Sequence, residues 1–147
     1  MRFACAFFVL SGLYLCASAS SAVATSLPPQ AAGKSTQDGV YTDAQAKRGE
    51  AAYGKTCAGC HGPDLAGADT APSLTGAEFT AGWTDQTLDD LFQRIQTTMP
   101  GDAPGSLSAE QCADILAFVL SKNGFPAGQS ELTAGPGLKD VKFVVKK

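Results

Sequence analysis

The sequence predicts a small all-α domain, because helix signals recur through its middle while a strand pattern is almost missing. Three segments between residues 42 and 126 carry helix caps, or apolar residues at helical spacing. Only Val141 to Lys147 alternates in the manner of a strand, and it does so loosely, so it is either a short strand or irregular. No internal repeat is visible. The range 42–126 is long enough for one compact domain.

The first predicted helix begins at Thr42 or Asp43, either of which can cap it, and it continues to residue 56. Gly49 and Tyr53 are four residues apart and therefore lie on one face. A glycine inside a helix costs about 0.5 to 1 kcal/mol relative to alanine. Gly49 is explained either by the close approach of another backbone or as a tolerated accident.

A middle helix is predicted over Thr84 to Thr97 from apolar residues at helical spacing. Acidic residues in its first turns suit the positive end of a helix dipole. The apolar positions are Leu88, Leu91, Phe92 and Ile95, and the acids are Asp85, Asp89 and Asp90.

The last helix has the clearest ends. Ser108 and Gln111 form a capping box, and Asn123 with Gly124 and the following Pro126 makes a stop signal. Its wide apolar stripe should face the core. The stripe consists of Cys112, Ile115, Leu116, Phe118, Val119 and Leu120. Cys112 is interpreted as a small buried hydrophobic residue rather than a ligand or a reactive thiol.

The two ends of the chain are predicted to lie outside this domain. Residues 1–24 have the layout of a cleavable signal peptide, with an apolar stretch shorter than the about 20 residues of a bilayer span. An uncleaved anchor and lipoprotein processing at Cys16 are the alternatives. Residues 25–41 are predicted to be a flexible segment and residues 127–147 a C-terminal tail. We therefore expect a periplasmic protein that is not membrane-associated after cleavage.

Cys57, Cys60 and His61 form a C-x-x-C-H motif, whose spacing lets two thiols bond to one haem while the imidazole binds its iron. His61 is the only histidine in the chain. A structural zinc site would need four ligands, which Cys112 cannot complete, and a thioredoxin-like pair would follow a strand rather than helical sequence. The motif therefore predicts one covalently attached haem c.

With these helices and this motif, the chain resembles the class I c-type cytochromes over roughly residues 42–126. It is most similar to small proteobacterial cytochromes associated with quinoprotein dehydrogenases, through the stretches 58–62, 97–100 and 113–118. That group usually has an aromatic or polar residue where Cys112 stands. The resemblance implies a small class I cytochrome c fold, with helices wrapped around the haem and Gly49 packed against Phe118.

The remaining site residues depend on this resemblance. Pro72 is expected to accept a hydrogen bond from the His61 imidazole through its carbonyl, which tunes the ligand. Met99 is the only methionine left after signal cleavage and stands in a Pro/Gly loop, so it is expected to be the second axial ligand rather than a core residue. Trp83 either binds a haem propionate or walls the pocket, and Arg94 either pairs with a propionate or is an exposed charge.

These residues predict an electron carrier, not an enzyme, that acts between exported redox partners such as a quinoprotein dehydrogenase or a terminal oxidase. A five-coordinate sensor or peroxidase-like enzyme would need distal polar groups, and no second histidine exists. A haem subunit of a quinoprotein dehydrogenase complex is the other alternative. Residues 42–126 carry five Lys and Arg against eleven Asp and Glu, which disfavours nucleic acid and favours a basic docking patch.

Overall fold

The computed structural model describes residues 33–69 and 71–146. The predicted signal peptide, residues 1–24, lies outside the described residues, as does the first half of the predicted flexible segment. No helix in the described part of the chain has both the length and the apolar character needed to cross a bilayer.

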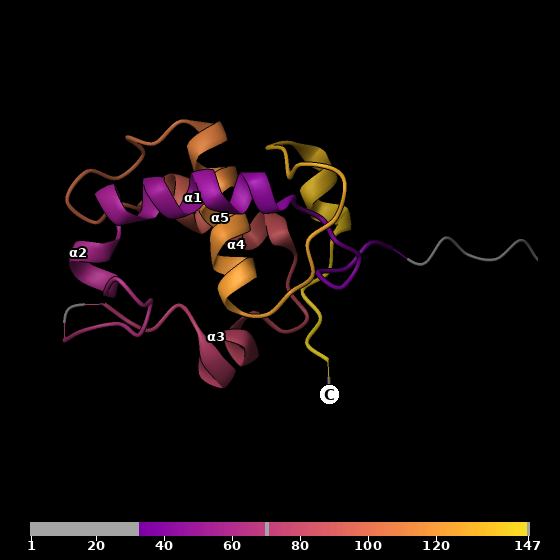
Figure 1. The fold of residues 1–147 in the computed structure, drawn as a ribbon, viewed down its shortest axis with the longest axis horizontal. Helices are drawn as coiled ribbons and strands as arrows, with labels where there is room; N and C mark the ends of the chain where they lie inside the picture. The colour runs from indigo at the N-terminus through magenta and orange to yellow at the C-terminus, as the bar shows by residue number, and fades with distance from the viewer. Residues whose placement is uncertain (1–32, 70, 147) are drawn as a thin grey trace, which may run out of the picture. The chain divides into compact units, whose positions relative to one another are not determined.

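The described residues are helical, which confirms the all-α class (Figure 1). They contain no β-strand, only isolated bridges. The elements in chain order are α1 (Asp43–Thr56), α2 (Ala58–His61), α3 (Gly76–Trp83), α4 (Leu88–Thr98), α5 (Ala109–Lys122) and the 3-10 helix η1 (Pro136–Asp140).

Helices α1 and α5 cross at Gly49 and form the centre of the core (Figure 1). A Cβ atom at Gly49 would lie 1.8 Å from the Asp114 carbonyl oxygen and 2.9 Å from the Phe118 Cβ, so the expected contact between Gly49 and Phe118 is confirmed. The Tyr53 and Phe118 rings pack with centroids 5.3 Å apart. Cys112 is completely buried in α5, as predicted. The close approach therefore explains the helical glycine.

Helix α4 begins at Leu88, so the predicted start at Thr84 is wrong. Thr87 caps the helix, because its Oγ1 accepts from the Asp90 N–H at 3.3 Å while the Asp90 carboxylate accepts from the Thr87 N–H at 2.8 Å. Asp85 has a φ of 69° and belongs to the turn before the helix, not to its first turn. The turn follows α3, a short helix that ends at Trp83. Phe79 is the buried residue of α3, and the apolar spacing of the sequence did not indicate this helix.

Segments on both sides of the predicted domain pack against it. Leu132, Leu138, Val141 and Phe143 are buried, and so are Thr36 and Tyr41 on the N-terminal side. Backbone hydrogen bonds join these segments: the Thr36 N–H donates to Lys142 O at 2.9 Å, and the Leu88 N–H donates to Val141 O at 2.9 Å. The last stretch forms isolated bridges at Lys142 and no strand over its described residues. The packed region is therefore longer than residues 42–126.

Polar side chains of α1 attach the C-terminal segment. The Gln45 side-chain amide, 2 % exposed, donates to Leu132 O and accepts from the Leu132 N–H, both at 2.7 Å. The Arg48 guanidinium binds Asp114 of α5 and also Glu131, at 2.9 Å each. This guanidinium lowers the pKa of Glu131. One helix turn of α1 thus holds both α5 and the segment that follows it.

Candidate haem site

The C-x-x-C-H motif begins at Cys57, where α1 ends, and continues through α2, the single helical turn that Cys57 precedes. The His61 N–H donates to Cys57 O at 2.9 Å, and the Cys60 N–H donates to the same oxygen at 3.1 Å. Residues three apart on a helical turn share a face, so the two thiols lie on the same side of α2. Cys57 is half-buried and Cys60 is exposed. Burial raises the pKa of Cys57.

His61 is buried, and its Nδ1 lies 2.8 Å from the Pro72 carbonyl oxygen. A carbonyl oxygen can only accept, so Nδ1 carries the ring proton and donates it. The other ring nitrogen, Nε2, then bears the lone pair that can bind a metal ion. The bond also fixes the orientation of the ring. His61 and Pro72 therefore have the arrangement of an axial imidazole and its hydrogen-bonding partner.

The loop after α2 is folded back on itself, and this brings Pro72 to His61. The Gly67 N–H donates to His61 O, and the Leu74 N–H donates to Leu65 O, each at 2.8 Å. Gly67 has a φ of 84°, and a Cβ there would lie 2.6 Å from the Ser73 nitrogen. Only glycine combines this conformation with that contact.

A residue that the sequence did not identify as functional also contacts this loop. The Tyr53 hydroxyl donates to the carbonyl oxygen of Gly62, the residue directly after His61, at 2.6 Å. Tyr53 is 2 % exposed, and burial raises its pKa to about 12, so the phenol stays protonated at neutral pH. The sequence contained one signal for this contact, since Tyr53 was placed on the same helix face as Gly49.

The other predicted residues come from α3 and α4. Met99 follows α4, is half-buried, and its N–H donates to Ile95 O at 3.1 Å. Trp83 ends α3 and packs against Phe79 with ring centroids 6.3 Å apart. Arg94 is exposed on α4. The hydrogen bonds described above join His61 to Pro72 and to Cys57, and they join Cys60 to Cys57. No hydrogen bond within the described residues joins Met99 or Trp83 to this group.

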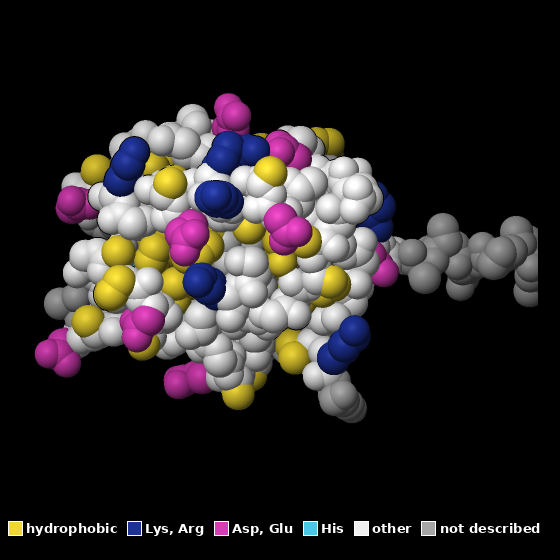
Figure 2. Space-filling model, in the orientation of Figure 1, with side chains coloured by type: hydrophobic (Ala, Val, Ile, Leu, Met, Phe, Trp, Pro, Cys, Tyr) yellow, Lys and Arg dark blue, Asp and Glu magenta, His cyan; other side chains and the backbone are white. Residues whose placement is uncertain are grey.

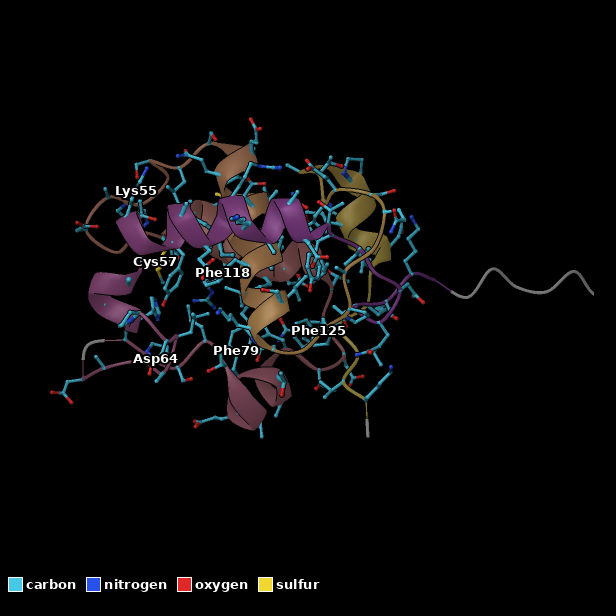
Figure 3. The ribbon with its side chains drawn as sticks, viewed as in Figure 1. Lys55, Cys57, Asp64, Phe79, Phe118 and Phe125 are labelled. Carbon is cyan, nitrogen blue, oxygen red and sulfur yellow. The ribbon has the colours of Figure 1, made fainter. Side chains whose placement is uncertain are left out.

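Apolar side chains lie beside the motif (Figure 2). Cys57, Ala58, Leu74 and Trp83 are partly buried against the core. Figure 2 shows hydrophobic side chains gathered between α1 and α3, beside α2, and Figure 3 places Cys57, Phe118 and Phe79 around the same face. A haem needs an apolar surface for its macrocycle, thiols for its vinyl groups and an imidazole for its iron. The residues present therefore fit the group.

Together the helical fold and the C-x-x-C-H turn define a class I c-type cytochrome. A family model described as cytochrome c oxidase, cbb3-type, subunit III matches residues 44–119. This is more than half of the chain, so the chain belongs to that family, and membership implies that it binds haem c.

A solved structure has a similar fold. The sulfane dehydrogenase SoxCD from Paracoccus pantotrophus is 24% identical in sequence, with a TM-score of 0.51. The match covers 63% of this chain and 52% of that chain, so this chain spans about half the length of its structural neighbour. No curated protein sequence matches the chain significantly.

Proposed function

We propose that the chain is a monohaem c-type cytochrome that carries single electrons between exported redox partners. One haem is linked through Cys57 and Cys60, with His61 and Met99 as the two axial ligands. The observation that carries this proposal is the hydrogen bond of 2.8 Å between His61 Nδ1 and Pro72 O, beside two thiols on one helical turn. It directs the metal-binding nitrogen of a buried imidazole away from the loop that holds the ring.

The bound haem supplies a reversible one-electron couple, and the chain's own residues set its environment. The Pro72 carbonyl holds the proton at His61 Nδ1 and leaves the Nε2 lone pair for the iron. The apolar side chains beside α2 would shield a bound haem from water. The Met99 thioether would supply the second ligand of the iron and would favour the ferrous state. Trp83 either walls the site or binds a propionate.

The exported location and the partners belong to the same proposal. Residues 1–24 resemble a cleavable signal peptide, which supports a periplasmic location. A quinoprotein dehydrogenase or a terminal oxidase is the proposed class of partner, and the matching family is named for an oxidase subunit. The structural neighbour is a sulfane dehydrogenase. The acidic charge of residues 42–126 favours a partner with a basic docking surface.

Substitution of Met99 tests the ligand set and the function together. The wild-type protein should be low-spin in both oxidation states, and its ferrous form should not bind carbon monoxide at neutral pH. Met99→Ala should open the sixth position, admit carbon monoxide and lower the reduction potential, because the sulfur ligand that favours ferrous iron is lost. Absorption spectra and potentiometric titration measure these changes. Thr97→Ala, at an exposed position two residues earlier, is the control and should behave as the wild type.

Two results would contradict the proposal. A wild-type protein that is already high-spin and binds carbon monoxide rapidly would favour the sensor or peroxidase-like class. Haem that acidified organic solvent extracts from the wild type would exclude covalent attachment at Cys57 and Cys60. Stable co-purification with a dehydrogenase would identify the chain as a haem subunit of a complex rather than a free carrier. The electron-transfer chemistry at the haem would be the same in both cases.

A further inference from the structure

Tyr53 joins the helix pair α1 and α5 to the loop that holds the imidazole. Its ring lies on Phe118 of α5, with centroids 5.3 Å apart and an interplanar angle of 52°. Its hydroxyl donates to Gly62 O at 2.6 Å. A buried phenol needs a hydrogen-bond partner, and here the partner is a backbone carbonyl in the loop rather than water. The rigid crossing of the two helices is thus connected directly to the residue after His61.

The backbone around His61 is held by a small set of hydrogen bonds. The Gly67 N–H donates to His61 O at 2.8 Å, and the Leu65 N–H donates to Gly62 O at 3.2 Å. Both of these bonds come from within the loop itself. The Tyr53 hydroxyl is the donor that reaches this part of the loop from α1. Without it, the Gly62 carbonyl keeps only the long contact from Leu65. The loop that carries Pro72 is then bonded to the helix pair only at its far end, where Asn123 at the end of α5 donates to Leu74 O at 2.9 Å.

We infer that Tyr53 is a positioning residue for the axial imidazole: its hydroxyl holds the peptide group after His61 and thereby keeps His61 Nδ1 in line with the Pro72 carbonyl. The inference rests on the proposed function, in which His61 binds the haem iron. A well-aligned bond at Nδ1 makes the imidazole a stronger electron donor to a bound iron, which stabilises the ferric state and lowers the reduction potential. Loss of the Tyr53 hydroxyl therefore weakens this effect, whereas the ring continues to pack against Phe118.

The test is Tyr53→Phe in the holoprotein, because this variant keeps the ring and removes only the donor. The reduction potential should be higher than that of the wild type. In the ferrous protein, the His61 Nδ1 proton should exchange with solvent faster, as measured by NMR spectroscopy, because the bond to Pro72 opens more often. A change in both quantities together indicates an effect at the imidazole, and the control below separates it from a general loss of packing.

Tyr41→Phe is the matched control. Tyr41 is also 2 % exposed, and its hydroxyl also donates to a backbone carbonyl, Phe125 O, at 2.6 Å. Both variants lose one buried hydrogen bond of the same kind, so both should lower the thermal midpoint. Only Tyr53→Phe should change the potential and the exchange rate. If the two variants give the wild-type values for both quantities, Tyr53 is merely structural and the inference is overturned.

A second substitution covers the case in which Tyr53→Phe yields no holoprotein. Site-specific 3-fluorotyrosine at position 53 makes the hydroxyl a stronger donor and should shift the potential below that of the wild type. An unchanged potential would overturn the inference. The ferrous NMR spectrum of the wild type shows whether the inference about Tyr53 or the proposed function itself is wrong. If the spectrum lacks a haem-bound His61 ring and an upfield-shifted Met99 methyl group, the ligand set itself is wrong.

Discussion

At the scale of single residues, two glycines of α1 show how the surroundings decide the effect of a side chain. A Cβ at Gly49 would meet the Asp114 carbonyl oxygen at 1.8 Å, a backbone atom that cannot rotate away. A Cβ at Gly54, five residues later in the same helix, meets nothing within 4 Å. Both positions carry the same cost of a helical glycine. Only at Gly49 does the missing side chain make room for another helix.

Gly49→Ala should therefore destabilise the holoprotein by about 3 kcal/mol, because α1 and α5 must move apart to admit the methyl group. Gly54→Ala should instead stabilise it by about 0.5 to 1 kcal/mol, since alanine is the better helix former and the position is open. Denaturant unfolding followed by circular dichroism measures both. Equal effects at the two positions would show that the helices do not meet at Gly49.

At the scale of elements, α1 and α5 are joined by two ion pairs that differ in burial. Arg48 binds Asp114 through two hydrogen bonds, from Nε at 3.0 Å and from Nη2 at 2.9 Å, and the Asp114 side chain is 10% exposed. Lys122 and Glu50 approach only to 3.9 Å, and both are exposed. A bidentate pair with a buried carboxylate is worth more than an exposed pair, in which solvent screens the attraction. The Arg48–Asp114 pair should therefore contribute more to the contact between the helices.

Asp114→Asn removes the charge while keeping the shape, and it should destabilise the holoprotein by about 1 to 2 kcal/mol. Glu50→Gln makes the same chemical change in the exposed pair and should cost less than about 0.5 kcal/mol. The free energy of unfolding at neutral pH is the measurement. A larger loss for Glu50→Gln than for Asp114→Asn would contradict the ranking.

At the scale of the whole described region, both flanking segments complete the core. Phe143 is 1% exposed, and its ring packs edge-on against Phe125 with centroids 5.0 Å apart. The Phe143 N–H donates to Gln86 O at 2.9 Å, in the turn before α4. The Lys142 backbone forms hydrogen bonds with the N-terminal segment: its N–H donates to Lys34 O, and its carbonyl oxygen accepts from the Thr36 N–H. The C-terminal segment therefore links the start of the described chain to α4.

Truncation after Pro126 removes this link and should lower the stability of the holoprotein by at least about 2 kcal/mol, because four buried apolar side chains are lost. The net loss is smaller than the sum of their burial energies, since the removed residues no longer need to be ordered. Truncation after Val144 is the control. It keeps the bond from Thr36 Oγ1 to Val144 O and should leave the thermal midpoint nearly unchanged. Equal midpoints for the two truncated forms would mean that the segment does not support the core.

Comparison of particular elements shows where sequence reasoning succeeded. The capping box of α5, formed by Ser108 and Gln111, was predicted correctly. The same kind of signal at Thr87 and Asp90 was overlooked, because apolar spacing extended the predicted α4 toward Thr84. Helix α3 buries only Phe79, so it has almost no apolar pattern to detect. The packing of the described flanking segments, 33–41 and 127–146, was not predicted for the same reason, since their buried residues are few and widely spaced.

By itself, the sequence determined features that act over a few residues: the spacing of Cys57, Cys60 and His61, the caps of α1 and α5, and the apolar stripe of α5. These features depend on local geometry, which residues close together in the sequence determine. Only the tertiary structure decided which distant groups meet, such as Tyr53 with the Gly62 carbonyl and Gln45 with Leu132. In both contacts one partner is a backbone atom that every residue possesses, so no sequence pattern can identify it.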